Sequence, residues 1–379
     1  MVWTPLHAKI HRTIRTRHLF ERHQRLLVAV SGGQDSLCLI KLLLDLQLKW
    51  GWHLGIAHCD HRWRSDSQAN ANHVENLAKT WGISFYLETA NELINSEAAA
   101  RDWRYQALST IAQTNNYQYI VTGHTASDRA ETLLYNLIRG TGADGLQALT
   151  WQRRLTTDIM LVRPLLKITR TQTQQFCQDF QLSVWEDSTN QDLQYARNRI
   201  RQELLPYLRE NFNPQVESAL AQTAELLQTE VEYLEKAAQQ LREEAMVWGV
   251  GDEEEDKQRS LSVDFRRTEL RGKDSLQFIS PLPLIPTSWE PRVPHLPISP
   301  LPSTVPLPLR INRCVLQKAP LALQRRVMRQ VLQQVLTDAP SFEHIEKLTA
   351  LIIAPNRSQT DPFPGGAIAQ VQGDWICFK

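Results

Sequence analysis

Short apolar runs alternate with longer amphipathic stretches from Arg25 to about Ile138. This alternation predicts strands that are each followed by a helix. The predicted strands are Leu26–Val30, Leu54–His58, Ser84–Leu87 and Tyr119–Thr122, and the predicted helices span 36–50, 67–81, 97–114 and 127–138. Repeated strand–helix units favour a doubly wound α/β domain with a parallel sheet, whose ligands bind beyond the carboxyl ends of the strands.

Helical patterns dominate the next part of the chain. A helix is predicted at 169–181, and a nearly continuous helical pattern runs from about Asn198 to Met246. Within it, apolar residues recur every seven positions in two series, Leu220, Leu227, Leu234, Leu241 and Ala224, Val231, Ala238, Ala245. We interpret this seam as packing against another helix of the same chain, with a homodimeric coiled coil as the alternative.

Residues 281–308 hold ten of the nineteen prolines, which predicts a polyproline-like linker. Helical patterning returns at 321–337 and 342–353, and a possible hairpin ends at Phe378, so we predict a small C-terminal α/β domain. The expected divisions are a basic N-terminal arm at 1–24, an α/β domain at 25–210, a helical linker at 211–280, the proline-rich linker at 281–308 and a C-terminal domain at 309–379.

The composition is that of a soluble globular protein, with 42% hydrophobic and 22% charged residues among 379. No apolar run reaches the roughly 18 residues that a membrane-spanning helix needs, so we expect no membrane and a cytoplasmic location. The five cysteines are scattered without a C-x-x-C pair, which predicts neither a disulfide framework nor a cysteine-rich metal site.

The net charge of +1 hides two basic stretches. Six Lys or Arg residues stand against one Glu through residue 25, and the stretch from Arg310 to Arg329 meets no acid before Asp338. Such local basic surfaces fit a polyanionic partner, although solvated helix faces would give the same pattern.

The strongest chemical signal is the segment 31–36, Ser-Gly-Gly-Gln-Asp-Ser, between the first predicted strand and helix. Gly32 and Gly33 allow a sharp turn, and the two serine hydroxyls with the helix N–H groups can hold an anion. Asp35 would repel a polyphosphate unless Mg²⁺ or a cationic side chain lay between them. The segment therefore predicts a phosphate site, with either a metal ion or a Lys or Arg side chain beside Asp35. It is not a G-x-x-x-x-G-K-[ST] loop.

Other candidate residues follow the later predicted strands. Residues 58–64 contain two histidines and an aspartate, for which a transition metal is a minority interpretation. Asp128 and Glu131 are three residues apart on one helical face and could hold an ammonium group. The segment 140–145 matches G-x-G-x-x-G but follows a predicted helix, so we predict no nicotinamide site there.

Arginines on predicted helices are the candidate ligands for phosphate charge. Arg104 shares a helix face with Glu97 and Arg101, and Arg197 and Arg201 share another at i and i+4. Guanidinium groups bind phosphate oxygens well, so these residues are expected at a phosphate site if their helices reach it.

Several of these motifs together resemble a known family. Residues 31–36 look like the SGGxDS loop of the N-type ATP pyrophosphatases, which have the adenine nucleotide alpha hydrolase-like fold. Within that superfamily the chain resembles the tRNA(Ile)-lysidine synthetase family. The matching segments are His58–Arg64, Glu97–Arg101 with Arg104-Tyr105, Gly123–Thr132, Arg139–Leu146, Arg163–Leu166, Asp187–Asn190 and Arg197–Arg201. Arg62 and Trp63 depart from the family pattern, as does the proline-rich stretch.

The resemblance implies an ATP-dependent enzyme that converts the wobble cytidine of the CAU-anticodon isoleucine tRNA to lysidine with L-lysine. It implies that residues 31–36 hold the pyrophosphate part of ATP with Mg²⁺ on Asp35. It further implies that substrate binds at a second set of residues, His58, Asp60, Asp128 and Glu131. Arg104, Arg197 and Arg201 are then assigned to polyphosphate charge, and the catalytic residues are Asp35, Asp128 and Arg201.

Because of their charge, the basic N-terminal arm and the stretch 310–329 are our candidates for contacts with the tRNA backbone. Two alternatives stay open. A related tRNA thiolase would need catalytic or cluster-binding cysteines, and Cys59 is the one thiol expected near the site. A tRNA-binding protein without catalysis is the second alternative.

Overall fold

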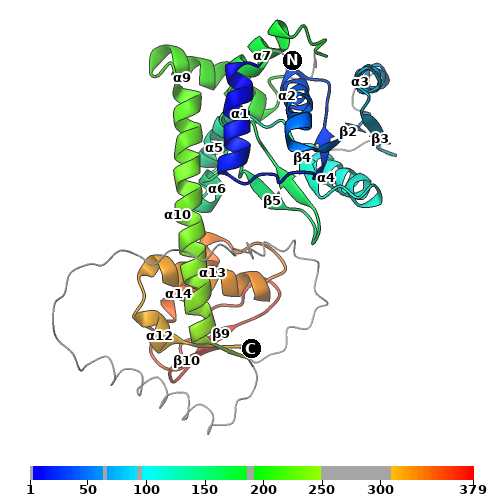
Figure 1. Ribbon diagram of the computed structural model, residues 1–379. Helices are drawn as coiled ribbons and strands as arrows, with labels where there is room; N and C mark the ends of the chain where they lie inside the picture. Colours follow the sequence, from blue (N-terminus) through cyan, green and yellow to red (C-terminus); the bar gives the residue numbers. More distant parts are fainter. Residues whose placement is uncertain (1–2, 63–65, 92–95, 186–191, 249–308) are drawn as a thin grey trace, which may run out of the picture. The chain divides into compact units, whose positions relative to one another are not determined.

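The computed structural model describes residues 3–62, 66–91, 96–185, 192–248 and 309–379. The proline-rich linker and the segment 186–191 lie outside the described residues. The described chain forms two compact units, which divide between Val231 and Glu232 within one long helix. Each unit has its own sheet and its own apolar core (Figure 1).

The N-terminal unit contains a six-stranded sheet in the order β3-β2-β1-β4-β6-β5. The strands are β1 (Arg25–Ala29), β2 (His53–Asp60), β3 (Ser84–Thr89), β4 (Tyr119–Val121), β5 (Gln152–Arg154) and β6 (Met160–Val162). Neighbouring strands pair in parallel except for β5, which pairs antiparallel with β6. The doubly wound fold predicted from the sequence is therefore confirmed, whereas the short strands β5 and β6 were not predicted.

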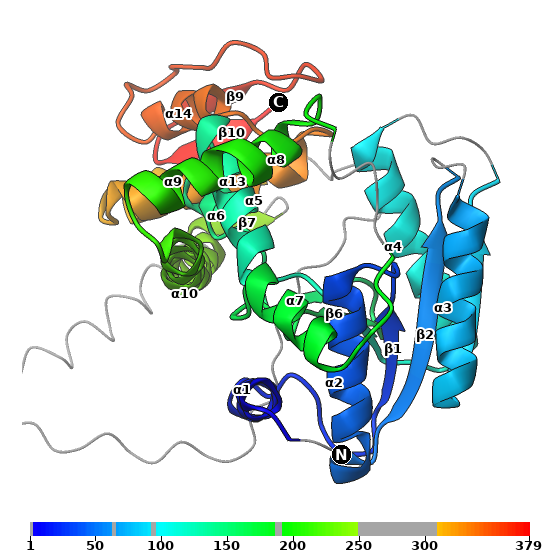
Figure 2. The same cartoon turned by 90° about the horizontal axis from the view of Figure 1, so that it is seen from above.

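Helices follow the strands as the alternating pattern requires. They are α1 (Pro5–Thr16), α2 (Gln34–Trp50), α3 (Ser67–Trp81), α4 (Glu97–Thr114), α5 (Ala126–Ile138), α6 (Ala143–Leu146) and α7 (Arg170–Asp179). After them come α8 (Ala196–Arg199), a π-helical turn (Ile200–Leu204), α9 (Leu205–Asn211) and α10 (Val216–Ala245). Helices α2 and α7 pack side by side (Figure 2).

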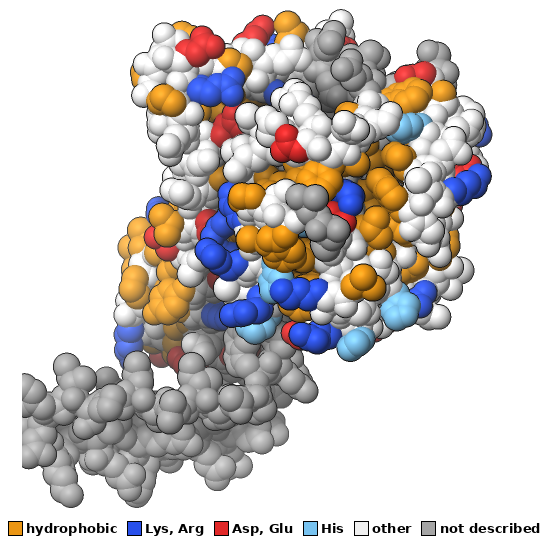
Figure 3. Space-filling model, turned by 45° about the horizontal axis from the view of Figure 1, so that its top comes forward, with side chains coloured by type: hydrophobic (Ala, Val, Ile, Leu, Met, Phe, Trp, Pro, Cys, Tyr) orange, Lys and Arg blue, Asp and Glu red, His pale blue; other side chains and the backbone are white. Residues whose placement is uncertain are grey.

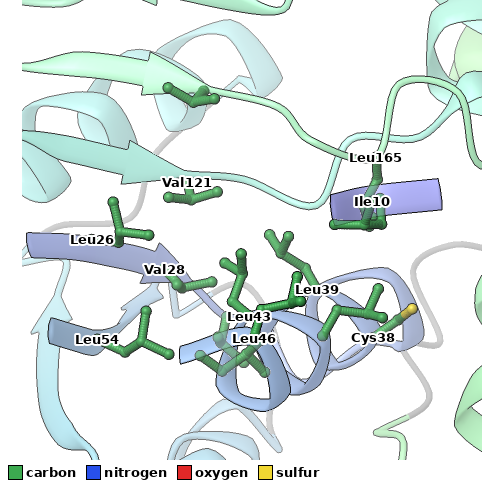
Figure 4. Packing of buried hydrophobic residues seen from close by; sticks show 14 of the residues in the cluster. Ile10, Leu26, Val28, Cys38, Leu39, Leu43, Leu46, Leu54, Val121 and Leu165 are labelled. Carbon is green, nitrogen blue, oxygen red and sulfur yellow. The ribbon is translucent and has the colours of Figure 1, made fainter. Parts of the chain in front are cut away.

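Apolar side chains fill both faces of the parallel sheet, which is why its strands read as continuous apolar runs. On one face, Leu26 and Val28 of β1 join a cluster with α1, α2, α3 and α7. On the other face, Leu27 joins a second cluster with α4. Figure 4 shows the first cluster, in which Leu39 and Leu43 of α2 lie against the strands.

The basic N-terminal segment is part of this core and does not form a separate arm. Ile10 and Ile14 of α1 are fully buried, and Figure 4 shows Ile10 beside Leu165. Thr4 caps the helix, and Pro5 fits its first turn, where no backbone N–H is needed. An apolar stripe within a charged segment therefore decides where the segment packs.

The C-terminal unit pairs a four-stranded sheet, in the order β7-β8-β10-β9, with helices (Figure 1). Its strands are β7 (Met246–Trp248), β8 (Leu309–Asn312), β9 (Ala369–Gln372) and β10 (Trp375–Phe378). Its helices are α12 (Arg313–Gln317), α13 (Leu321–Val335) and α14 (Phe342–Ala350). The strand pairs are antiparallel, and the predicted hairpin ending at Phe378 is confirmed as β9–β10.

The seven-residue repeat in α10 buries its alanine and valine series. Ala224, Ala238 and Ala245 are fully buried and Val231 nearly so, while the leucines of the second series are only partly covered. For Ala238 and Ala245 this burial supports packing within the chain, because both belong to the apolar cluster of the C-terminal unit. In the described part of the chain, no helix has the length and apolar character needed to cross a membrane.

Candidate active site

The loop at 31–36 connects β1 to α2 and forms a turn stabilised by its own serines. Gly32 has φ +89°, a conformation that glycine adopts without strain. The Ser36 hydroxyl donates to the Gly33 carbonyl at 2.8 Å and accepts from the Ser31 backbone N–H at 3.2 Å. Gly33 precedes the first turn of α2 and offers no side chain to cap it, so the N–H groups there remain suited to an anion.

A second loop, after β4, touches this first one. Strands β2 and β4 flank β1 on opposite sides, so the strand order reverses here and a ligand crevice is expected. A Cβ atom at Gly123 would lie 3.0 Å from the carbonyl of Asp35, which explains the glycine. The close approach brings Asp35 next to the start of α5, where Asp128 and Glu131 lie.

Three carboxylates converge at this point on one guanidinium group, that of Arg170. Its Nε lies 3.2 Å from Asp35 Oδ2, its Nη2 2.6 Å from Asp128 Oδ1 and its Nη1 2.6 Å from Glu131 Oε1. The Arg170 backbone N–H also donates to the Ser127 hydroxyl at 3.1 Å. One arginine at the first position of α7 thus links the loop at 31–36 with α5.

Arg201 joins the cluster from the π-helical turn. Its Nε lies 2.9 Å from Oε1 of Glu131 and its Nη2 lies 2.9 Å from Oε2, which makes a bidentate pair. Ile200 and Leu205, five residues apart, both pack on Ala130 of α5. In a π turn, residues i and i+5 share a face, whereas an α-helix would point them apart, so this turn lets both apolar anchors reach α5.

Asp35 and Asp128 are each held by further hydrogen bonds. The Thr173 hydroxyl of α7 donates to Asp35 Oδ1, and Gln34 Nε2 donates to that hydroxyl at 3.2 Å. Asp128 Oδ2 accepts the backbone N–H and the hydroxyl of Thr125 at 2.7 and 2.8 Å. This capping box fixes the start of α5, so Asp128 has a structural role besides any chemical one.

Burial and charge shift the pKa values of these groups in opposite directions. Burial raises the pKa of Asp35, and the neighbouring Asp128 adds to this, against the opposing effect of Arg170. Burial also acts upward on Asp128, but Arg170 and the Thr125 hydrogen bonds outweigh it and lower its pKa. The three carboxylates raise the pKa of Arg170 despite its burial, so it stays cationic.

A neutral histidine lies beside the cluster. Burial, together with the positive charges of Arg163, Arg101 and Arg104, lowers the pKa of His124 to about 3. Its Nδ1 lies 2.9 Å from the Thr122 hydroxyl. His124 is therefore uncharged near neutral pH and can exchange hydrogen bonds without adding to the positive charge around it.

The other residues predicted for the site lie around this cluster. Arg104 Nη2 lies 2.8 Å from His61 Nε2, and the guanidinium of Arg197 lies over the Tyr135 ring, 5.6 Å from its centroid. His58 is buried with Nδ1 2.7 Å from the Val30 carbonyl, and Asp60 accepts the Arg62 backbone N–H at 2.8 Å. Thus Arg170 links Asp35 to Asp128 and Glu131, and Arg201 binds Glu131. Contacts with other neighbours hold Arg104, Arg197, His58 and Asp60.

Arg170 was missed by sequence reasoning although it contacts more of the predicted residues than any other side chain in this cluster. It stands at the first turn of a helix, where a cation is unfavourable, so a compensating carboxylate could have been sought. The three carboxylates that it meets lie 39 to 135 residues away in the sequence, which the local pattern does not encode.

A separate group of cations lies on α1, α5 and the segment before α7. Lys9 donates to the Lys167 carbonyl at 2.8 Å, and Lys167 Nζ lies 3.5 Å from Glu225 of α10. Arg17 pairs with the same Glu225 and lies over the Trp151 ring. Nη1 of the buried Arg129 lies 3.5 Å from Oε2 of Glu225. One carboxylate thus faces several cations. Figure 3 shows Lys and Arg side chains gathered in groups on the face it presents.

The basic stretch at 310–329 is partly neutralised in the folded chain. Glu346 makes a bidentate pair with Arg325, and Glu235 pairs with both Arg326 and Arg329. Both acids lie outside the stretch itself, 21 residues or more from their partners, so the run of basic residues overstates the positive charge of the surface.

Family models match both ends of the chain. The PP-loop domain matches residues 4–208, and the TilS substrate binding domain matches 312–374. A tRNA(Ile)-lysidine synthase of Nostoc sp. is 71% identical over 379 residues, covering 100% of this chain and 98% of that protein. The chain belongs to the tRNA(Ile)-lysidine synthase family. Family members are ATP-dependent ligases of the PP-loop group.

More distant relatives of the same family match most of the chain. One from Synechocystis sp. is 44% identical, with 99% of this chain and 98% of that protein covered. A chloroplastic synthase of Zygnema circumcarinatum is 33% identical and covers 92% and 80%. Among solved structures, a U34-tRNA thiolase from Methanococcus maripaludis matches with a TM-score of 0.51 at 15% identity, over 59% of this chain and 78% of that one, a likeness of fold alone.

Proposed function

We propose that this member of the tRNA(Ile)-lysidine synthase family ligates L-lysine to the wobble cytidine of the CAU anticodon of isoleucine tRNA. The cytidine C2 oxygen attacks the α-phosphorus of ATP, and the bond to pyrophosphate breaks. The lysine ε-amine then attacks C2, the C2–O bond breaks, AMP leaves and the amine loses a proton. The observation that carries the proposal is the convergence of Asp35, from the loop at 31–36, with Asp128 and Glu131 from α5.

The residues present fit a Mg²⁺ ion bound together with ATP. Mg²⁺ is usually held by one or two carboxylates, with phosphate oxygens and waters completing its six ligands. Asp35 supplies such a carboxylate beside the uncapped first turn of α2. The ion would lessen the repulsion between this carboxylate and the phosphates. The N–H groups of that turn and the serine hydroxyls would hold the phosphates themselves.

Asp128 and Glu131 are proposed to bind the ammonium group of lysine. They lie on one face of α5, and Glu131 is buried, so water screens the negative charge of the pair poorly. Arg201 would keep Glu131 in place and stabilise negative charge on the phosphates. Holding the amine beside the adenylated cytidine replaces an encounter in solution by a reaction between positioned groups.

For tRNA, we propose backbone contacts on the cations of α1 and on the free part of 310–329. Arg12 and Arg15 are exposed on α1, and Lys318 is exposed after α12. Contacts of this kind are electrostatic and independent of base sequence. They should weaken steeply with added salt.

The deciding experiment measures AMP release from α-labelled ATP with Mg²⁺, a CAU-anticodon isoleucine tRNA transcript and each amino acid in turn. Nucleoside analysis of the tRNA follows. Modification of the wobble cytidine only when lysine is supplied supports the proposal. AMP formation without any dependence on lysine would overturn the substrate while leaving the ATP chemistry in place.

A tRNA thiolase activity is the alternative reaction on this fold. Cys59 lies at the end of β2, and burial raises the pKa of its thiol to about 12, which disfavours the thiolate that sulfur transfer requires. A Cys59→Ala variant that keeps full lysine-dependent activity would exclude this alternative. An inactive tRNA-binding protein would release no AMP under any of these conditions.

A further inference from the structure

Arg170 occupies the place where the proposed lysine ammonium would bind. Its Nη1 and Nη2 bridge Glu131 and Asp128 at 2.6 Å each. A substrate ammonium within hydrogen-bond distance of the same two carboxylates would lie next to this guanidinium. Two cations that bridge one pair of carboxylates repel each other, so Arg170 and lysine compete.

The side chain of Arg170 can leave while its backbone stays anchored. The backbone N–H is fixed to the Ser127 hydroxyl, but the side chain is 26% exposed and its long stem can rotate. Its Nε already contacts Asp35, which belongs to the loop at 31–36. A phosphate bound to that loop would offer the guanidinium anionic oxygens on its other side, and arginine binds such oxygens well.

The charges of the cluster favour such an exchange. Three carboxylates face Arg170 and Arg201, so the ligand-free cluster carries one negative charge in excess. When Arg170 turns toward the phosphates, Arg201 remains as the cation that the described residues place beside Asp128 and Glu131. A lysine ammonium would then replace the positive charge that Arg170 had supplied to Asp128 and Glu131.

We propose that Arg170 is a positioning residue that makes lysine binding depend on ATP. Without ATP it blocks Asp128 and Glu131; with ATP it turns to the phosphates and frees them. This inference rests on the proposed function, because it takes lysine as the ligand of those carboxylates. It also places lysine after ATP in the order of binding, which keeps the amine away until the phosphates are loaded.

The test is the affinity of the full chain for L-lysine, measured by calorimetry with Mg²⁺ and without tRNA. Each protein is titrated with and without α,β-methylene ATP, which cannot be cleaved between the α and β phosphates. In the unaltered protein, the analogue should tighten lysine binding by about tenfold. Arg170→Gln should bind lysine tightly without the analogue, and the analogue should add less than about twofold.

Three further variants separate the possible causes. Arg170→Lys, which cannot bridge three carboxylates, should show intermediate coupling and serves if the glutamine variant folds poorly. Arg154→Gln, on the edge strand β5, is the matched control and should behave as the unaltered protein. Glu131→Gln should lose lysine affinity both with and without the analogue.

The outcomes distinguish the inference from the function on which it rests. If Arg170→Gln keeps the full ATP dependence, the inference is wrong even when Glu131→Gln loses lysine. If Glu131→Gln binds lysine normally, the assignment of lysine to these carboxylates fails first. Coupling is reciprocal, so lysine must tighten binding of the analogue by the same factor in the unaltered protein. Absence of that coupling also overturns the inference.

Discussion

The pair between Glu131 and Arg201 should anchor the π-helical turn to α5, and a double-mutant cycle can measure that anchor. Glu131 is 4% exposed and Arg201 28% exposed, and they share two hydrogen bonds of 2.9 Å. Breaking a buried pair costs about 3–5 kcal/mol, and the partial exposure of Arg201 reduces this to about 2 kcal/mol. Each 1.4 kcal/mol changes a local opening equilibrium about tenfold, so 2 kcal/mol corresponds to about 30-fold.

Hydrogen exchange followed by mass spectrometry reads this opening locally, which suits a chain with two units that need not unfold together. Glu131→Gln and Arg201→Gln should each speed exchange of residues 200–204 by about 30-fold, and the double variant should add little more. Glu203→Gln, on the same turn but exposed, is the control and should change nothing measurable. If the double variant shows the sum of the two single-variant free-energy costs for opening residues 200–204, Arg201 does not act through Glu131.

Three other predictions follow from burial, close contact and pKa. In denaturant titration, Ile10→Ala should lower the unfolding free energy of the N-terminal unit by about 2–4 kcal/mol, whereas Leu48→Ala, 98% exposed, should cost that unit under about 0.5 kcal/mol. Gly123→Val should weaken binding of a fluorescent ATP analogue because its side chain would collide with the Asp35 backbone, while Gly142→Ala should not. Burial and nearby arginines lower the pKa of His124 to about 3, so on acidification the unfolded chain takes up this proton at a higher pH than the folded chain does. The unfolding free energy should therefore decrease as the pH is lowered from 6.5 to about 3, and it should decrease less steeply in His124→Gln.

The sheet and its helices were predictable because the parallel strands are buried on both faces. Leu26, Leu27 and Val28 are all inside, so the run reads as apolar without interruption. The strand β6 escaped because it has only three residues and pairs with an equally short β5. The equally short β4 was found because it is apolar and followed by a helix, whereas β5 is polar throughout and pairs antiparallel with β6, outside the strand–helix alternation.

The site was predictable where residues follow strands and unpredictable where it depends on distant pairing. Asp35 and Asp128 were found because each lies just after a strand of the sheet. Arg170 was not found, because only the folded chain shows that three carboxylates surround it. The stretch 310–329 shows the same limit, since Glu235 neutralises part of it from a position about 90 residues earlier.

The π-helical turn has a consequence for how the length of this segment can vary. A π turn is a helix that has taken in one extra residue, and here the extra residue lies between the two apolar anchors Ile200 and Leu205. Loss of one exposed position, Gln202 or Glu203, would bring the anchors to a spacing of four and leave an ordinary α-helix with both still on one face. Most helices are disrupted by a single deletion, but this one has a place where a residue can be gained or lost while its apolar face stays aligned.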